Sequence, residues 1–299
     1  MASLGRRSTR AALTGWLLCL PALAIFGVFF VGPALVGFYV SLFDWNGSSP
    51  NMTFVGFGNY AAILADDQFW NAVRITLMAL AFMLLIKLPL ALLMAVGLSA
   101  PGPVKRFYRT AVFLPYVLST TMVAIIWVFL LDPYQGLINY LLRSFGLAAW
   151  QQGWLGQGST ALPSVVVAGA WWTFGLYVVL FTAGLASIPK DFYDAARLET
   201  NSRLQVLLRI TIPLMREQIF VACIMTTGGV LGFLTGFFLL LTGGGPAGRT
   251  ETLGIMSYHA AFRGLEFGNA SAISVLVLIF MFVLIIGPTI RVVRHRVEY

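Results

Sequence analysis

Few side chains in this sequence are of the types, and at the spacing, that perform chemistry. The strongest candidate is the segment GGGPAGRT, Gly243 to Thr250, which is close to a phosphate-binding loop but has Arg249 where that motif needs lysine. A phosphate-binding loop requires a buried strand before it and a helix after it, whereas this segment follows a long apolar run. We therefore expect a flexible turn here, not a nucleotide site.

The other reactive side chains are isolated. His259 and His295 each stand alone, and Cys19 and Cys223 each fall inside an apolar run, as small buried hydrophobic residues do. The sequence has no His/Cys spacing typical of a metal site and no Ser-His-Asp set. We therefore expect no catalytic residue, no metal and no cofactor on this chain.

Lys87 is the one charged residue that falls deep inside an apolar run. A charge at such a position is costly in a membrane and usually faces a bundle interior or a cavity. The alternative is a lysine whose stem extends toward the interface, with its position relaxed by Pro89. The sequence leaves both interpretations open.

Composition indicates the elements that must position these residues. The chain of 299 residues is 59% hydrophobic but only 10% charged, with a mean hydropathy of +0.86, too little charge for the surface of a soluble domain. A run of roughly 18 apolar residues suffices to span a bilayer. The sequence therefore predicts an all-α, polytopic membrane protein with six transmembrane helices, near 14–42, 71–99, 108–131, 161–187, 217–241 and 270–290.

Basic residues are distributed asymmetrically between the connections. Of the 19 Lys and Arg residues, 14 lie before the first run, between runs two and three, between runs four and five, or after the sixth; only Arg74, Arg143, Arg249 and Arg263 lie in the other connections. Excess Lys and Arg marks the cytoplasmic side. Both termini should therefore be cytoplasmic, with the basic surface attracted to anionic membrane lipid and no nucleic-acid partner expected.

One cytoplasmic connection is amphipathic, DFYDAARLETNSRLQVLLRITIP, residues 191–213. Carboxylates in the first turn after Pro189 favour a helix N-terminus, and Leu204, Leu207 and Leu208 recur at helical spacing. Such a helix can lie on the membrane surface, or it can fit a groove on a cytoplasmic partner.

This segment resembles the "EAA" loop in the inner-membrane permease subunits of binding-protein-dependent ABC importers. The residues that match the loop are Asp194, Ala195, Ala196, Glu199 and Pro213. Thr200 replaces the usual glycine and Asn201 the usual alanine. The stretches 54–77, 109–142, 183–189 and 241–262, the last with its TGGGP…TE loop, are similar to the sugar-permease branch of that family.

The resemblance implies an ABC importer type I permease fold and an ATP-driven uptake system for a carbohydrate or a related polyol or glycerol-phosphate-type solute. Residues 1–69 would hold the cytoplasmic N-terminus, the first span and an external loop. Residues 70–290 would form the core permease domain, with a cytoplasmic coupling loop at 188–214, and 291–299 would form a cytoplasmic tail. The expected location is a bacterial inner membrane.

The resemblance also implies partners. These are a second homologous permease, two cytoplasmic ATPase subunits that carry ATP and Mg, and an extracytoplasmic solute-binding protein that delivers solute to loops 44–69, 132–160 and 242–269. Residues 194–196, 199, 200 and 213 would couple the permease to its ATPases. The alternatives are a stand-alone secondary transporter or channel and, less favoured, a membrane enzyme. All 11 acidic residues lie in connections or tails, and no internal repeat is evident, so neither alternative is favoured.

Two further sets of residues suggest roles inside the membrane. Gly169, Trp172, Thr173 and Leu176 share one face of the fourth run, where tryptophan and threonine could contact a sugar ring; an interfacial aromatic belt is the alternative for Trp171 and Trp172. Thr235 is the one polar residue in VLGFLTGFFLL, a stretch that is often more polar in sugar permeases. The candidates for a solute path are therefore Gly169, Trp172, Thr173, Leu176 and Thr235. Gly228, Gly232 and Gly236 recur every four residues and predict a helix-packing stripe, or a stripe along which a gate slides.

Overall fold

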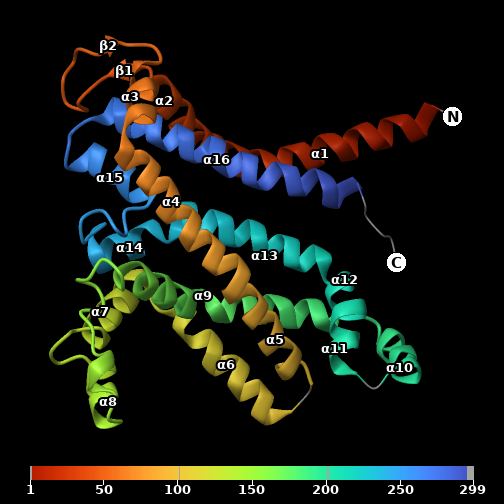
Figure 1. Ribbon diagram of the computed structural model, residues 1–299. Helices are drawn as coiled ribbons and strands as arrows, with labels where there is room; N and C mark the ends of the chain where they lie inside the picture. The colour runs from red at the N-terminus through yellow and green to blue at the C-terminus, as the bar shows by residue number, and fades with distance from the viewer. Residues whose placement is uncertain (1, 101, 201, 295–299) are drawn as a thin grey trace. The chain divides into compact units, whose positions relative to one another are not determined.

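The computed structural model describes residues 2–100, 102–200 and 202–294, and these are mainly helical (Figure 1). In this described part the only strands are β1, Phe43–Asp44, and β2, Thr53–Phe54, which pair antiparallel with Phe43 opposite Phe54. The predicted all-α class is confirmed. The chain divides into two compact units, Met1–Ala65 with Ser257–Leu276, and Asp66–Met256 with Val277–Tyr299.

The first unit contains the N-terminal apolar helix and the loop that follows it. Its elements are α1 (Ala2–Phe26), the π-helix η1 (Gly27–Val31), α2 (Gly32–Val40), the two strands and α3 (Gly58–Ala65). The Nδ2 of Asn59 donates hydrogen bonds to the carbonyl oxygens of Ser41 and Phe43, both at 2.9 Å. The apolar stretch Thr14–Val40 is long enough to span a membrane, and its most apolar part buries no residue against the rest of the chain.

The second unit is the larger helical bundle. Its first elements are α4 (Asp67–Phe82), the π-helix η2 (Met83–Lys87), α5 (Leu88–Leu98), α6 (Pro103–Val117), α7 (Thr120–Leu130), α8 (Leu137–Ser144) and η3 (Ala148–Trp150). The later elements are α9 (Ala161–Ala186), α10 (Lys190–Glu199), α11 (Arg203–Val206), η4 (Leu207–Thr211), α12 (Ile212–Leu214), α13 (Arg216–Gly228), η5 (Gly229–Phe233) and α14 (Thr235–Thr242). The division between the units falls within α15 (Leu253–Phe262) and α16 (Phe267–Arg294).

Helix α9 is the centre of this bundle. It packs against α4, α5, α6, α13 and α14, and 67% of its most apolar stretch is buried, the highest share among the four single-helix spans of the described residues. A helix that is apolar on every side is expected to be enclosed by others. Its first half contributes to a core around Trp172, Phe237 and Phe238, and its second half to a core around Phe181 and Met215.

Two of the six predicted spans are bent helix pairs. The described residues contain four single helices long and apolar enough to cross a membrane, and six spans if each bent pair counts as one. The predicted span 108–131 is broken, because α6 and α7 meet at 99°. Pro115 lacks an N–H for the helix ladder, and the Ser119 side chain accepts a hydrogen bond from the Met122 N–H at 3.3 Å, which caps a new helix. The fifth span bends by 46° between η5 and α14.

Candidate functional site

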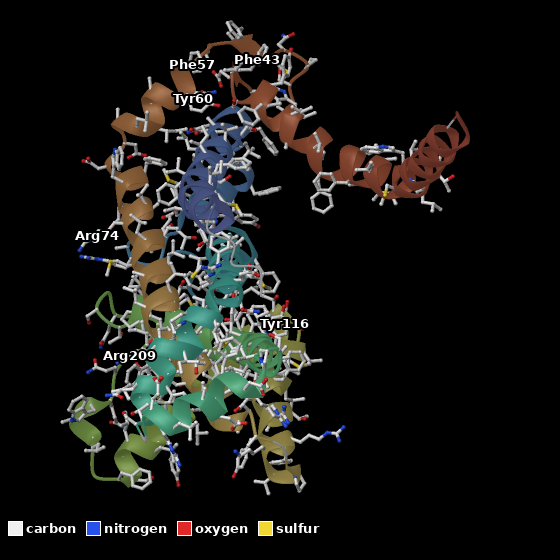
Figure 2. All side chains as sticks on the ribbon, turned by 90° about the vertical axis from the view of Figure 1, so that its right-hand side faces the viewer. Phe43, Phe57, Tyr60, Arg74, Tyr116 and Arg209 are labelled. Atoms are coloured by element: carbon white, nitrogen blue, oxygen red, sulfur yellow. The ribbon has the colours of Figure 1, made fainter. Side chains whose placement is uncertain are left out.

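The charged connection between the fourth and fifth spans folds as a series of short helices. We call residues 188–214 the coupling segment; it contains α10, α11, η4 and α12. Asp191 lies in the first turn of α10, and Pro213 lies directly after the π-helix η4, within the continuous helix formed by η4 and α12. Arg209 is exposed on this segment (Figure 2).

Thr200 ends α10 without the glycine that the EAA loop usually has here. Its φ is −153°, an extended conformation that any residue adopts, and its N–H donates to the Ala196 carbonyl oxygen at 2.9 Å. Its hydroxyl donates to Gln205 Oε1 at 2.7 Å and accepts from the Ser202 N–H at 3.1 Å. The threonine hydroxyl therefore closes the turn onto α11.

The two alanines of the EAA match have different surroundings. Ala196 is only 4% exposed and is buried against its own chain, whereas Ala195, Asp194 and Glu199 are exposed. Leu198 is 90% exposed, the highest value among the large apolar side chains. The sequence placed both alanines at a contact with a partner. The structure leaves Ala195 and Leu198 on the outer surface of α10, while the Ala196 methyl already fills a place inside the chain.

A cavity of about 690 Å³ lies between the coupling segment and the ends of the spans. Arg109, Lys190 and Arg203 line it, together with the Tyr193 and Thr200 side chains. Of the described residues that line this cavity, none is acidic. On this side, a cavity with a basic lining therefore separates the coupling segment from the ends of the spans.

Lys87 points into the bundle. It is 3% exposed, its Nζ lies 3.8 Å from the centre of the Tyr177 ring, and it is 3.4 Å from Thr173 Oγ1. Thr173 Oγ1 itself donates to the Gly169 carbonyl oxygen at 2.9 Å, so it accepts from the lysine. Of the two interpretations that the sequence left open, the structure favours the interior one.

A second cavity, of about 230 Å³, adjoins Lys87. We call it the Lys87 cavity. Two of the five residues proposed for a solute path, Thr173 and Leu176, line it, and so do Tyr116, Tyr177 and Thr226. Tyr116, labelled in Figure 2, is a residue of α6.

The remaining solute-path candidates do not line this cavity. Trp172 is 2% exposed, stacks on Phe233 with ring centres 5.2 Å apart, and donates from Nε1 to the Leu118 carbonyl oxygen at 3.3 Å. Gly169 lies against Phe237 and Phe238, and the Thr235 side chain faces Gly254. Trp171, in contrast, is 43% exposed and contacts the Trp127 ring. A path role for Trp172, Gly169 and Thr235 therefore needs a rearrangement of this core.

The glycine stripe of the fifth span is not a continuous contact within this chain. A Cβ on Gly228 would lie 3.2 Å from Met281 Cε, but a Cβ on Gly232 or Gly236 would have nothing within 4 Å. The π-helix η5 follows Gly228 and contains Gly232, and the 46° bend comes directly after it, so the four-residue spacing no longer places Gly228 on one face with the later glycines. Gly232 and Gly236 are exposed.

The glycine-rich loop at 243–250 is a closed turn after α14 with no strand before it. Thr250 Oγ1 lies 2.6 Å from Thr242 Oγ1 and donates to the Gly245 carbonyl oxygen at 2.7 Å, while Asn71 Nδ2 donates to the Gly248 carbonyl oxygen at 3.1 Å. Thr250 is fully buried. The loop is therefore more firmly held than the flexible turn that we expected, and its surroundings are not those of a phosphate-binding loop.

The connection at 132–160 is organised by one buried asparagine that the sequence did not single out. Asn139 Nδ2 donates to the carbonyl oxygens of Pro133 and Gln152, both at 3.0 Å, and its Oδ1 accepts from Trp154 Nε1 at 2.8 Å. At the start of this loop, hydrogen bonds from the N–H groups of Gln135 and Tyr134 lower the pKa of the Asp132 carboxyl below its usual value. The loop therefore has a defined shape of its own.

Sequence reasoning missed the three other residues with polar side chains that line the Lys87 cavity: Tyr116, Tyr177 and Thr226. Tyr177 follows Thr173 by one helical turn, so it could have been found by extending the face of α9 on which Thr173 lies. Tyr116 and Thr226 come from α6 and α13, and only the packing of these helices around α9 brings them to Lys87.

Comparison with known proteins identifies close relatives. Residues 87–296 match the family model described as binding-protein-dependent transport system inner membrane component. The diacetylchitobiose uptake system permease protein NgcF of Streptomyces coelicolor is 34% identical over 85% of this chain and 74% of its own length. The sn-glycerol-3-phosphate transport system permease protein UgpA of Agrobacterium fabrum is 31% identical over 95% of this chain and 96% of its own length.

The fold is also similar to that of a solved structure. A chain in the crystal structure of a bacterial ABC transporter involved in the import of the acidic polysaccharide alginate aligns with a TM-score of 0.81. The alignment covers 98% of this chain and 99% of that one, at 22% sequence identity. At this identity the likeness concerns the fold.

Proposed function

This chain belongs to the family of binding-protein-dependent transport system inner membrane components and is a permease subunit of an ABC importer, and we propose that its solute is a carbohydrate or a related polyol or glycerol phosphate. The named systems of NgcF and UgpA support this solute class, since one takes up diacetylchitobiose and the other sn-glycerol 3-phosphate. No catalytic role is assigned to this chain, and ATP hydrolysis belongs to separate subunits.

The proposed complex contains four kinds of protein. A second homologous permease would complete the translocation path, two cytoplasmic ATPase subunits would drive it with ATP and Mg, and a solute-binding protein outside the membrane would deliver the solute. The family's dependence on a binding protein supports the last of these. The shaped loop at 132–160, held by Asn139, suits such a docking role.

The orientation we propose has both termini and the coupling segment in the cytoplasm. The distribution of 14 of the 19 basic residues over connections on one side supports it, provided that α6 and α7 together cross the membrane. Reporter fusions after Arg109 and after Arg216 should then give a cytoplasmic signal, and a fusion at Gly248 an external one. An external signal after Arg216 would contradict both the orientation and the coupling role.

The coupling role rests on the exposure of an apolar side chain on the outer surface of α10. Leu198 is 90% exposed beside the charged residues Asp194 and Glu199. An apolar side chain flanked by charges is a suitable anchor for a groove on another protein, with the charges setting the register. We propose that Leu198 and Ala195 enter a cleft on the ATPase and that Ala196 supports α10 from within.

Leu198→Asp tests this role directly. Because Leu198 packs little against its own chain, the substitution should leave the bundle folded, but it would place an unpaired charge in a desolvated contact. A cost of about 3 kcal/mol or more is expected, and each ~1.4 kcal/mol weakens binding tenfold. The ATPase subunits should therefore be lost when the permease complex is purified, and ATP-driven uptake should stop.

The matched control is Val104→Asp. Val104 is also exposed, at 65%, and lies at the start of α6 outside the coupling segment. Its variant should keep the ATPases. If Leu198→Asp also keeps them and transports at the wild-type rate, the coupling role of α10 fails. Ala196→Asp is less informative, since burying a charge at this 4% exposed position would unfold the segment whether or not a partner docks there.

A further inference from the structure

Lys87 is a buried basic residue without an anionic partner among the residues that surround it. It is only 3% exposed, and its amine lies against the Tyr177 ring and the Thr173 hydroxyl. Of the described residues that line the Lys87 cavity, none is Asp or Glu. A charge removed from water costs free energy unless it is paired. A lysine buried at such a cost calls for a source of negative charge.

Lys87 lies inside the span Asp67–Leu98 and not at its end. It directly precedes the 11 residues of α5, which at 1.5 Å per residue place it about 16 Å from the C-terminal end of that span. It also ends the π-helix η2, whose extra residue per turn closes with the Leu88 N–H donating to the Met83 carbonyl oxygen. Such π-bulges are frequent at functional sites.

The cavity beside Lys87 offers further hydrogen-bonding groups. The Tyr116, Tyr177 and Thr173 side chains line it. The Thr226 hydroxyl faces the Tyr177 side chain but makes no hydrogen bond of ordinary geometry within the described residues, although it is only 2% exposed. A cation surrounded by hydroxyl groups is the kind of environment that binds a carboxylate or phosphate through charge-assisted hydrogen bonds.

The cavity is also accessible from outside the chain. Phe233, 55% exposed, and Met225, 41% exposed, form part of its lining. Its volume of about 230 Å³ is smaller than the pockets of roughly 300–1,000 Å³ that enclose a drug-sized ligand. It therefore suits one charged group or one ring of a solute, with the rest of the solute held elsewhere along the path.

We infer that Lys87 is an anion-binding residue within the translocation path and that the solute of this importer carries a carboxylate or phosphate group. This inference rests on the proposed function and narrows it from carbohydrates and polyols in general to their acidic members. The Thr173 and Tyr177 side chains hold the lysine amine in the cavity until the negative group of the solute arrives.

The test uses the complete importer in proteoliposomes, with two pairs of probes. Cellobiouronate against cellobiose isolates a carboxylate, and sn-glycerol 3-phosphate against glycerol isolates a phosphate. The wild-type complex should import the anionic member of at least one pair in preference to its neutral counterpart, and the pair concerned identifies the charged group. Lys87→Met, which is unbranched and one atom shorter and which removes the charge, should lower uptake of that anionic probe about tenfold or more.

Two further variants make the result specific. Lys87→Arg keeps a positive charge and should retain more anionic uptake than Lys87→Met. Lys105→Met removes one positive charge from α6, outside the cavity, and should behave as the wild type. Wild-type uptake of the anionic probe by Lys87→Met, or import of the neutral members only, would overturn the inference while leaving an ATP-driven importer in place.

Assembly is read separately by co-purification. Loss of the second permease from the Lys87→Met complex would also overturn the inference, because the anionic partner of the lysine would then be a carboxylate of that subunit. Retention of both partners together with selective loss of the anionic probe would support it. Failure of the wild-type chain to retain ATPase subunits would instead contradict the proposed function itself.

Discussion

The fourth and fifth spans are both apolar and rich in glycine, yet glycines of the two spans differ in how closely the rest of the chain packs against them. In α9, a Cβ on Gly175 would overlap the Val112 carbonyl oxygen and lie 2.6 Å from Phe113 Cα, so α6 and α9 are in backbone contact there. In the fifth span, a Cβ on Gly232 or Gly236 would have no neighbour within 4 Å. The same residue type serves close packing in one helix and an open face in the other.

This difference distinguishes a helix that is packed within the chain from a helix face that is open to other molecules. Helix α9 packs against five other α-helices of its own unit. The fifth span instead has exposed residues at Gly232, Phe233, Gly236 and Leu240. Small residues on an exposed helix face allow another helix to approach closely in a membrane. The exposed glycines therefore suit a contact outside this chain, with the second permease as the proposed partner.

The largest effect on stability is expected from Gly175→Ala. The overlapping atoms belong to the α6 backbone, which cannot move aside as the end of a flexible side chain can. Overpacking of this kind typically costs about 1–3 kcal/mol, more than the gain of about 1 kcal/mol that alanine brings to a helix. The unfolding temperature of the purified chain in detergent should fall. An unchanged value would mean that α6 and α9 are not in backbone contact.

An intermediate effect is expected from Gly184→Ala, nearer the C-terminal end of α9. The new methyl group would lie 2.7 Å from Gln218 Cγ and 3.1 Å from Met215 Cε. Both are side-chain atoms that can move by a few tenths of an ångström. Destabilisation should be smaller than for Gly175→Ala when the two variants are compared in one unfolding experiment, and the reverse order would contradict the assignment of the tighter contact.

The smallest effect on the isolated chain is expected from Gly232→Leu. With open space around this position, the leucine has nothing in its own chain to displace, so the unfolding temperature should stay at the wild-type value. A clear fall would show that this face is packed within the chain. The complex should respond differently, since a leucine would hold off a closely packed second permease while Gly232→Ala would be mild.

The contrast between the two spans also shows how far sequence reasoning reached. The four-residue spacing predicts a stripe of Gly228, Gly232 and Gly236. Residues at this spacing share one face only in an uninterrupted α-helix. The π-helix Gly229–Phe233 and the bend after it rotate the later glycines away from the first. The prediction of a span at 108–131 missed its 99° bend for a similar reason. Whether a helix breaks in a membrane depends on which neighbours satisfy the freed backbone groups.

What the sequence determined by itself was the all-α class, the approximate positions of the apolar runs, the charge asymmetry and the amphipathic coupling segment, because run length and charge placement are local properties. What only the tertiary structure decided was the direction of each side chain. Lys87 faces the interior, Ala196 is buried while Ala195 is exposed, and Trp172 is in the core while Trp171 is at the surface. Adjacent residues with the same hydropathy differ in this way because burial depends on which distant helix packs on each face.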